Sequence, residues 1–234
     1  MGLALLSTNV GSLGDPVSHT RRDLLNRLLD TKHAIGKFPD IVGLQEIMRF
    51  DMRLSPCFGL PIATDAHVSV TADTGEPLRR GVATYAAADT IHIDPIDDTC
   101  ESVATVREYR NHTTRGNKLK KLLYINVYKL CNTRGMCASS DDLRLVIDKY
   151  RQIAREEHNV HETVVTGDFN DVDFYVPGLR ELRHDKAYHR HETGKAKRFI
   201  EKVFTNVAHA LIKHVMQSCE NRVQDEENDL GHKK

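Results

Sequence analysis

Short apolar segments that end in polar residues recur along most of this chain. Segments 3–10 and 41–44 have the apolar and β-branched character of strands. Between them, leucines recur at helical spacing after the candidate N-caps Ser18 and Thr20, at Leu24, Leu25, Leu28 and Leu29. The first fifth of the sequence therefore predicts a strand–helix–strand unit.

The middle of the chain predicts several further strands. The turn-rich segment Thr71 to Arg80 separates two of them, and the basic, glycine-containing segment Asn111 to Lys121 predicts a hairpin or loop between two others. The predicted strands are Ala63 to Val70, Gly81 to Ala86, Ser102 to Tyr109 and Leu122 to Leu130. In the last of these, Tyr124, Asn126 and Tyr128 alternate onto one face.

A helix and a buried strand follow. Ser139-Ser140 can cap a helix that carries Asp141-Asp142 in its first turn, where acidic residues complement the helix dipole. The helix has an apolar stripe at Leu143, Val146, Ile147, Tyr150 and Ile153. The β-branched run Thr163 to Thr166 then predicts a strand, which Gly167 is expected to end.

In the C-terminal fifth, apolar residues fall at helical spacing, which favours a helix: Ile200, Val203, Phe204, Val207, Leu211 and Val215. Residues 223–234 are expected to form a polar tail. We therefore expect a single domain over residues 1–222, followed by that tail.

Composition describes an ordinary globular protein. The chain has 234 residues, 40% of them hydrophobic and 28% charged, and its 33 basic and 33 acidic residues give zero formal net charge. Contact with nucleic acid would therefore depend on local basic stretches, of which 180–202 and 111–121 are the clearest.

The cysteines and the apolar runs indicate where in the cell the protein is expected to be found. Five widely spaced cysteines without a CxxC pair predict reduced thiols in an intracellular protein, nuclear or cytoplasmic. No apolar run approaches the ~18 residues of a membrane-spanning helix, so no membrane partner is expected.

Polar residues at the strand exits are the candidate chemistry. Asp168 and Asn170 leave the β-branched strand two residues apart, a spacing that can direct a carboxylate and a carboxamide into one cleft. These residue types are equally typical of an Asx turn. Asn9, Glu46, and Asn126 with Tyr128 stand at other strand exits.

The order and spacing of these exits resemble the endonuclease/exonuclease/phosphatase superfamily. The matching segments run over about residues 3–175: Leu5-Leu6-Ser7-Thr8-Asn9-Val10, Asp40-Ile41-Val42-Gly43-Leu44-Gln45-Glu46, Arg80-Gly81-Val82-Ala83-Thr84-Tyr85, Leu122-Leu123-Tyr124-Ile125-Asn126-Val127-Tyr128 and Val164-Val165-Thr166-Gly167-Asp168-Phe169-Asn170. The resemblance implies an α/β fold, a four-layer sandwich of two packed mixed sheets flanked by helices. The divergent C-terminus allows the last strand of that fold to be missing here.

The same resemblance implies a mechanism and roles for residues. The expected reaction is Mg²⁺-dependent phosphoester hydrolysis, with Mn²⁺ as a possible substitute. Glu46 would bind the metal beside Asn9, Asp168 would orient or deprotonate the attacking water, and Asn170 would hold the scissile phosphate. Asn9 and Asn126 are the expected substrate-binding residues.

Three further positions bear on the implied site. Tyr128 stands where the abasic-site and retrotransposon enzymes keep a tyrosine near the phosphate, which favours a nuclease. The family's late Ile-Asp strand has a loose counterpart in 199–204, with Glu201 in place of Asp. Its C-terminal Ser-Asp-His motif does not occur, and His232 is the candidate for the catalytic imidazole.

These observations predict a Mg²⁺-dependent phosphodiester hydrolase, an endonuclease acting on nucleic acid, with DNA favoured over RNA. Two alternatives stay open. One is a phosphatase or deadenylase of the same fold, and the other is a catalytically inactive binding or structural domain. The divergent C-terminus also allows this chain to be a piece of a larger polyprotein or part of an assembly.

Overall fold

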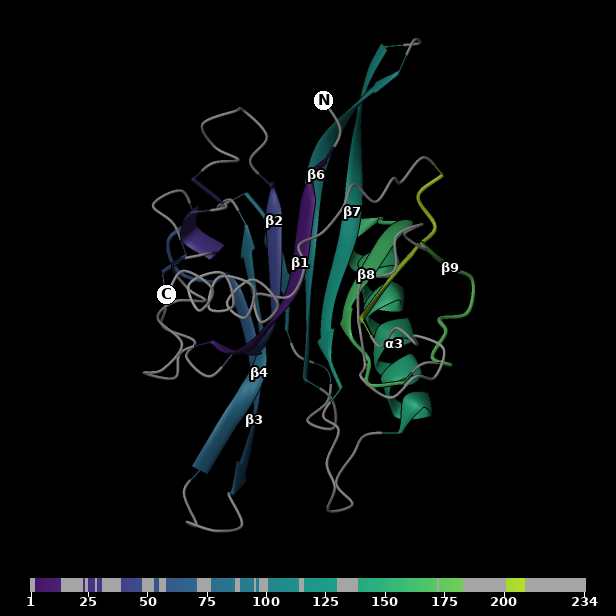
Figure 1. Cartoon of the computed structure of the whole chain (residues 1–234). Coiled ribbons are helices and arrows are strands. Elements are labelled where there is room, and N and C mark those ends of the chain that lie inside the picture. The colour runs from purple at the N-terminus through teal and green to yellow at the C-terminus, as the bar shows by residue number, and fades with distance from the viewer. Residues whose placement is uncertain are drawn as a thin grey trace, which may run out of the picture.

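The computed structural model describes the two sheets and the main helix of the protein (Figure 1). The described residues are 3–13, 23, 25–27, 29–30, 39–47, 53–54, 58–70, 77–86, 89–94, 96, 101–113, 116–129, 139–171, 173–182 and 201–208. His232, the tail 223–234, the five cysteines and most of the basic segment 180–202 lie outside them. No described helix is long and apolar enough to cross a membrane.

The first sheet has four strands in the order β1-β2-β4-β3. β1 (Leu5–Leu13) runs parallel to β2 (Ile41–Ile47), with Asn9 opposite Gln45. β4 (Pro77–Ala86) is antiparallel to both β2 and β3 (Ala63–Val70).

The second sheet has six strands in the order β5-β6-β7-β8-β10-β9. Its centre is a parallel pair, β7 (Gly116–Tyr128) and β8 (Glu162–Asp168), joined through α3 (Ser140–His158). The antiparallel strands are β5, β6, β10 and β9, with bounds Ile91–Ile93, Glu101–Thr113, Glu201–Thr205 and Arg180–Glu181.

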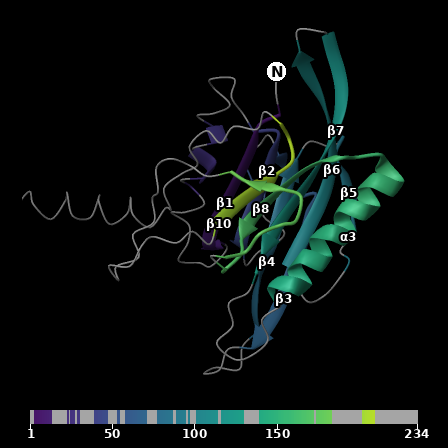
Figure 2. The ribbon, with the colours of Figure 1, turned by 90° about the vertical axis from the view of Figure 1, so that its right-hand side faces the viewer.

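The sheets pack on one another, and helical residues contact the outer face of each. Ile41 of the first sheet packs with Leu122 and Tyr124 of the second. α3 lies over the outer face of the six-stranded sheet (Figure 2), where its predicted stripe is buried from Leu143 to Tyr150. On the opposite outer face, Leu25 and Leu29, in helical conformation, pack against the first sheet. The protein thus has two mixed sheets of four and six strands, and α3 is the one complete helix within the described residues.

Most strands were predicted at the correct place in the sequence, but the predicted ranges of several were too short. β2 continues through Gln45 and Glu46, and β4 begins at Pro77 within the expected turn region. β1 continues beyond the expected end at residue 10, to Leu13. The basic segment 111–121 is a hairpin whose two sides are strand, because β6 and β7 pair continuously from Glu101↔Tyr128 to Thr113↔Gly116.

The helical interpretation of segment 199–204 is wrong for its described part. Residues 201–205 form β10, antiparallel to β8, with Glu201 opposite Asp168. Phe204 is buried with Phe169 and Phe174 under α3, so the sheet edge and this aromatic cluster determine the conformation.

Gly167 does not end the strand, as the sequence analysis expected. β8 continues through it to Asp168, with φ of 155° at Gly167. A Cβ atom at this position would stand 2.0 Å from the carbonyl oxygen of Val127. Glycine is required here because the backbones of β7 and β8 approach closely just before the polar exit of β8.

We expect Gly167→Ala to destabilise the protein by about 2 kcal/mol or more, because the new Cβ must displace the Val127 carbonyl in addition to adopting an unfavourable φ. The measurement is the free energy of unfolding in urea. Gly59→Ala is the matched control, since Gly59 has a φ of 69° but its new Cβ would meet no atom within 4 Å. Equal losses in both variants would mean that the clash contributes nothing.

Candidate active site

Residues at or near the carboxyl ends of four strands meet at one end of the sandwich. Asn9 on β1 donates from Nδ2 to Oδ2 of Asp168 on β8, across the two sheets, at 2.9 Å. Tyr128 on β7 donates its hydroxyl proton to Oε1 of Glu46 on β2 at 2.7 Å, also between sheets. Tyr128 lies opposite Asp168 in the register of β7 and β8. The predicted residues Asn9, Glu46, Tyr128 and Asp168 are therefore brought together.

The carboxylate of Asp168 is held on two sides. One oxygen accepts from Asn9, and the other, Oδ1, accepts from the backbone N–H of Asn170 at 3.0 Å. Asp168 is 3% exposed, so its carboxylate is almost wholly shielded from bulk water. A buried carboxylate fixed in this way is oriented without needing to reorganise during a reaction.

Asn170 is placed by the loop that leaves β8. Its φ of 46° is left-handed, and its side chain donates from Nδ2 to the carbonyl oxygen of Lys129 at 2.6 Å. The neighbouring Phe169 is fully buried and stacks on Phe174 at 4.6 Å between ring centroids. Because Phe169 packs into the core under α3, Asp168 and Asn170 are anchored on either side of it.

A second set of contacts fixes the same loop to α3. Ser140, the first residue of α3, donates its hydroxyl proton to Asp171, and Lys129 Nζ donates to Ser140 Oγ at 2.8 Å. The hydrogen bond from Ser140 lowers the pKa of Asp171, and the nearby ammonium groups of Lys129 and Lys202 lower it further. Asp171 thus remains ionised and links the exits of β7 and β8 to the start of α3.

Glu46 also has an unusual backbone. Its φ is 57°, in a region of backbone conformation that residues other than glycine rarely adopt. Three non-glycine residues among those described have positive φ, and two of them, Glu46 and Asn170, are candidate site residues. The third, Asn159, is the C-cap of α3. Such conformations concentrate at functional sites, where the surrounding contacts offset their cost.

Asn126 has a different position from the one expected. Its side chain is fully buried between the sheets, where Nδ2 donates to the carbonyl oxygens of Leu44 and Ala83, each at 3.1 Å. Its Oδ1 accepts from Nε2 of Gln45 at 2.5 Å. The expectation that Asn126 binds substrate stays a prediction, while in the structure its amide links β7 to β2 and β4. It supports the strand that carries Glu46.

Gln45 is a residue that the sequence analysis missed as a contributor. It is 1% exposed, and Nε2 donates to Ser7 Oγ at 3.1 Å as well as to Asn126. It lies in a strand directly before Glu46. A polar residue in an otherwise apolar buried strand was the available signal, since buried amides require partners.

Glu101 extends the polar row across the second sheet. It lies opposite Tyr128 in the register of β6 and β7, as Asp168 does on the other side. Burial raises the pKa of Glu101 to about 8, and the neighbouring carboxylate of Asp65 on β3 adds to this rise. Glu101 is therefore mainly protonated at neutral pH, and it was not among the expected site residues.

The donor chemistry of the site is compatible with Mg²⁺. This ion is commonly held by one or two carboxylates together with waters and substrate phosphate oxygens. Glu46 and Asp168 supply carboxylates, and Asn9 and Asn170 supply amide groups, at the same end of the sandwich. Within the described residues, no three His, Cys, Asp or Glu side chains lie close enough together to hold a metal ion.

We expect Asn126→Ala to cost about 2–4 kcal/mol of unfolding free energy, because it leaves Gln45 and two backbone carbonyls without their buried partner. Denaturant unfolding measures this loss. Asn170→Ala is the comparison, since Asn170 is only half-buried and its amide has one hydrogen-bond acceptor in Lys129. A loss at Asn126 no larger than that at Asn170 would contradict the role of Asn126 as a link between the sheets.

Glu101 predicts a pH dependence of stability. Its folded-state pKa of about 8 lies above the ordinary value of 4.5, so the folded protein binds the proton more tightly than the unfolded chain does. The contribution of the protonated Glu101 to the free energy of unfolding is fully present below pH 4.5 and is lost as the pH rises toward 8. Compared with Glu101→Gln, the wild type should lose stability between pH 5 and 8, by about 1.4 kcal/mol per unit of pKa difference. Parallel stability curves for the two proteins would refute this.

Among the comparisons with known proteins, only the comparison with solved structures found matches. No family model and no curated protein matches the sequence. A mannosyl-6-phosphatase from Bacteroides thetaiotaomicron is 12% identical, with 88% of this chain and 86% of that chain covered and a TM-score of 0.48. An endonuclease/exonuclease/phosphatase family protein from the same organism is 16% identical, with 87% and 82% covered and a TM-score of 0.49.

Two eukaryotic structures are similar over the same extent of this chain. The human nocturnin catalytic domain, solved with bound sulfate, is 10% identical, with 87% and 81% covered and a TM-score of 0.47. TDP2 from Caenorhabditis elegans is 13% identical, with 87% and 63% covered and a TM-score of 0.46. Solved structural neighbours across most of this chain thus include endonuclease/exonuclease/phosphatase family proteins.

Proposed function

We propose that this protein is a divalent-cation-dependent phosphodiester hydrolase that cleaves nucleic acid within the strand. The observation that supports this most directly is the meeting of Asn9, Glu46, Tyr128, Asp168 and Asn170 at one end of the sandwich. These residues come from distant parts of the sequence, and together they present two carboxylates, a phenol and two amides. That chemistry suits hydrolysis of a phosphate ester.

Asp168 is the residue we assign to the attacking water. Its carboxylate is held by Asn9 and by the N–H of Asn170, so it can accept a hydrogen bond or a proton from a water in a fixed direction. Fixing the acceptor in advance lowers the cost of aligning the water with the phosphorus atom.

Asn170 is the residue we assign to the phosphate. Its Nδ2 group has two hydrogens, and the Lys129 carbonyl accepts one of them. The second can donate to a phosphate oxygen. The left-handed backbone and the buried Phe169 hold this amide beside the Asp168 carboxylate.

Glu46, with Asn9 nearby, is the group we assign to Mg²⁺, or to Mn²⁺ in its place. The Tyr128 hydroxyl donates to one oxygen of the Glu46 carboxylate and so fixes its direction. A bound ion would offset the negative charge that develops on the phosphate and on the leaving oxygen. We therefore assign Tyr128 the role of orienting Glu46.

We expect Asp168→Asn and Glu46→Gln each to lower the cleavage rate by about a thousandfold or more, since each removes a charge that the reaction needs. The measurement is nicking of supercoiled plasmid and of an abasic-site duplex, with and without Mg²⁺. Asp148→Asn is the matched control, because Asp148 is an exposed carboxylate on α3 that pairs with Arg151.

The same assay separates the remaining alternatives. Metal-dependent release of phosphate from inositol phosphates, or shortening of poly(A), without plasmid nicking would identify a phosphatase or deadenylase. Retained cleavage in both site variants would reject the assigned roles. A well-folded wild type that acts on none of these substrates would favour a non-catalytic binding domain.

A further inference from the structure

The hairpin of β6 and β7 extends beyond both sheets. β5 pairs with β6 only as far as Val106, and β8 pairs with β7 only from Leu122 onward. Beyond these points, residues 107–113 and 116–121 pair only with each other within the described residues. We call this two-stranded projection the β6–β7 arm, and Figure 1 shows it standing away from the rest of the protein.

The base of the arm is fixed to the body. The Tyr109 hydroxyl and Lys120 Nζ both donate to the carboxylate of Glu162, at the start of β8. Arg107 forms ion pairs with Asp40 at 3.7 Å and with Asp89 at 3.2 Å. These contacts set the direction in which the arm projects.

The arm is strongly basic although the whole chain is neutral. Residues 107–121 contain six basic side chains against one acidic side chain, Glu108: Arg107, Arg110, Arg115, Lys118, Lys120 and Lys121. Arg107, Lys120 and Lys121 have acidic partners. Nearer the tip, Arg110 and Lys118 are exposed, and no ion pair joins either of them to another described residue.

This arm contributes little to the core. A two-stranded ribbon is at best marginally stable in water, and Leu119 on it is 64% exposed. A basic ribbon that is held out from the body but buries little surface presents its cations to a partner. The dense negative charge of a phosphate backbone matches such a surface, and the major groove of a duplex admits a two-stranded ribbon.

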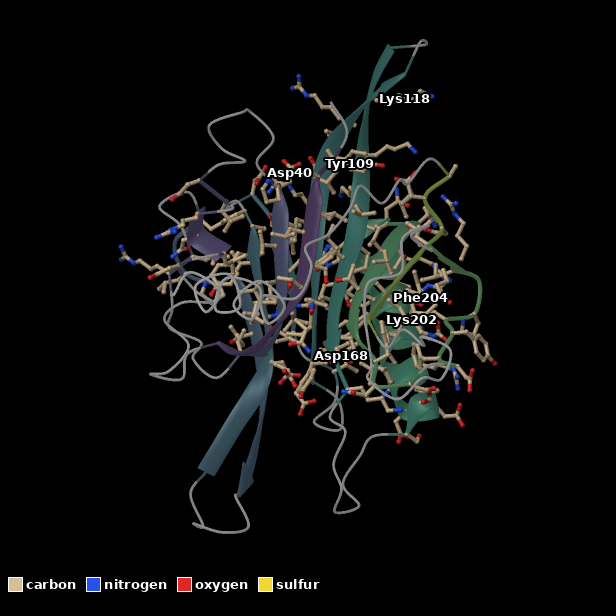
Figure 3. The ribbon with its side chains drawn as sticks, in the orientation of Figure 1. Asp40, Tyr109, Lys118, Asp168, Lys202 and Phe204 are labelled. Atoms are coloured by element: carbon tan, nitrogen blue, oxygen red, sulfur yellow. The ribbon has the colours of Figure 1, made fainter. Side chains whose placement is uncertain are left out.

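We propose that the β6–β7 arm is a second nucleic-acid contact, in which Arg110 and Lys118 bind the phosphate backbone of a duplex. Lys118 lies on the arm near the top of Figure 3, and Asp168 lies well below it, beside the far end of β7. Ten residues of β7 separate Lys118 from Tyr128, which corresponds to roughly 33 Å of extended strand. The arm is thus distinct from the catalytic end, and the choice of nucleic acid as its partner rests on the proposed function.

The test is binding of a fluorescein-labelled 24-base-pair duplex DNA to the full chain, followed by anisotropy across a range of salt concentrations. Arg110→Gln/Lys118→Gln should lower the affinity about tenfold at ~100 mM salt and reduce the slope of log K against log salt by about 1.8, as expected for two lost phosphate contacts. Lys149→Gln/Arg155→Gln removes the same charge from exposed positions on α3 and should change the affinity less than about twofold.

Activity is measured separately on a small phosphodiester, bis-p-nitrophenyl phosphate. Unchanged hydrolysis by the arm variant, together with weaker duplex binding, supports the arm as a distant contact. If the wild type does not hydrolyse this phosphodiester, the result counts against the proposed function but does not affect the measurement of duplex binding. Duplex binding equal to that of the wild type, or equally weakened in the α3 control, would overturn the arm proposal.

Two other outcomes would also overturn it. Cations on open strand edges can serve to prevent pairing with other chains. An arm variant that self-associates in sedimentation but binds duplex normally would assign that protective role. Arm-dependent binding to vesicles of phosphatidylserine, without arm-dependent binding to duplex, would assign the surface to anionic lipid.

Discussion

The contact between the two sheets at their polar end is the constraint on which the site depends. Asn9 and Asp168 join β1 to β8, and Tyr128 and Glu46 join β7 to β2. Behind them, the buried amides of Gln45 and Asn126 hydrogen-bond across the same interface. Since each buried polar group needs its partner, a shift of one sheet against the other would leave several of them unpaired. The site geometry is therefore set by the packing of the sheets.

The topology explains why the exits meet. β1 and β2 are parallel, as are β7 and β8, so the carboxyl ends of each pair lie at one edge. Packing the two sheets brings both edges to the same end of the molecule. α3 returns the chain from β7 to β8, and its first residue, Ser140, is linked to the β8 exit through Asp171. Two strand pairs and one helix thus position residues that are far apart in sequence.

Much of this arrangement could be predicted from the residues, and the failures have physical causes. The β-branched run before Gly167 and the capping box at Ser139 are local signals, and both elements form where they were expected. The length of the β6–β7 hairpin and the strand at Glu201 depend on pairing with distant segments, which periodicity does not encode. The contacts of Asn126 between the sheets could not be predicted, because an amide facing another strand and an amide facing substrate have the same pattern in sequence.

The backbone at the site connects stability with chemistry. Left-handed conformations at Glu46 and Asn170 each cost about 1–3 kcal/mol relative to relaxed backbone, so they persist only where neighbouring contacts fix them. At Asn170 those contacts are the Asp168 carboxylate, the Lys129 carbonyl and the buried ring of Phe169. At Glu46 they are the Tyr128 hydroxyl and the buried amide of the preceding Gln45. Two of the five residues proposed for the site thus occupy unfavourable backbone, and the polar contacts around them keep them there.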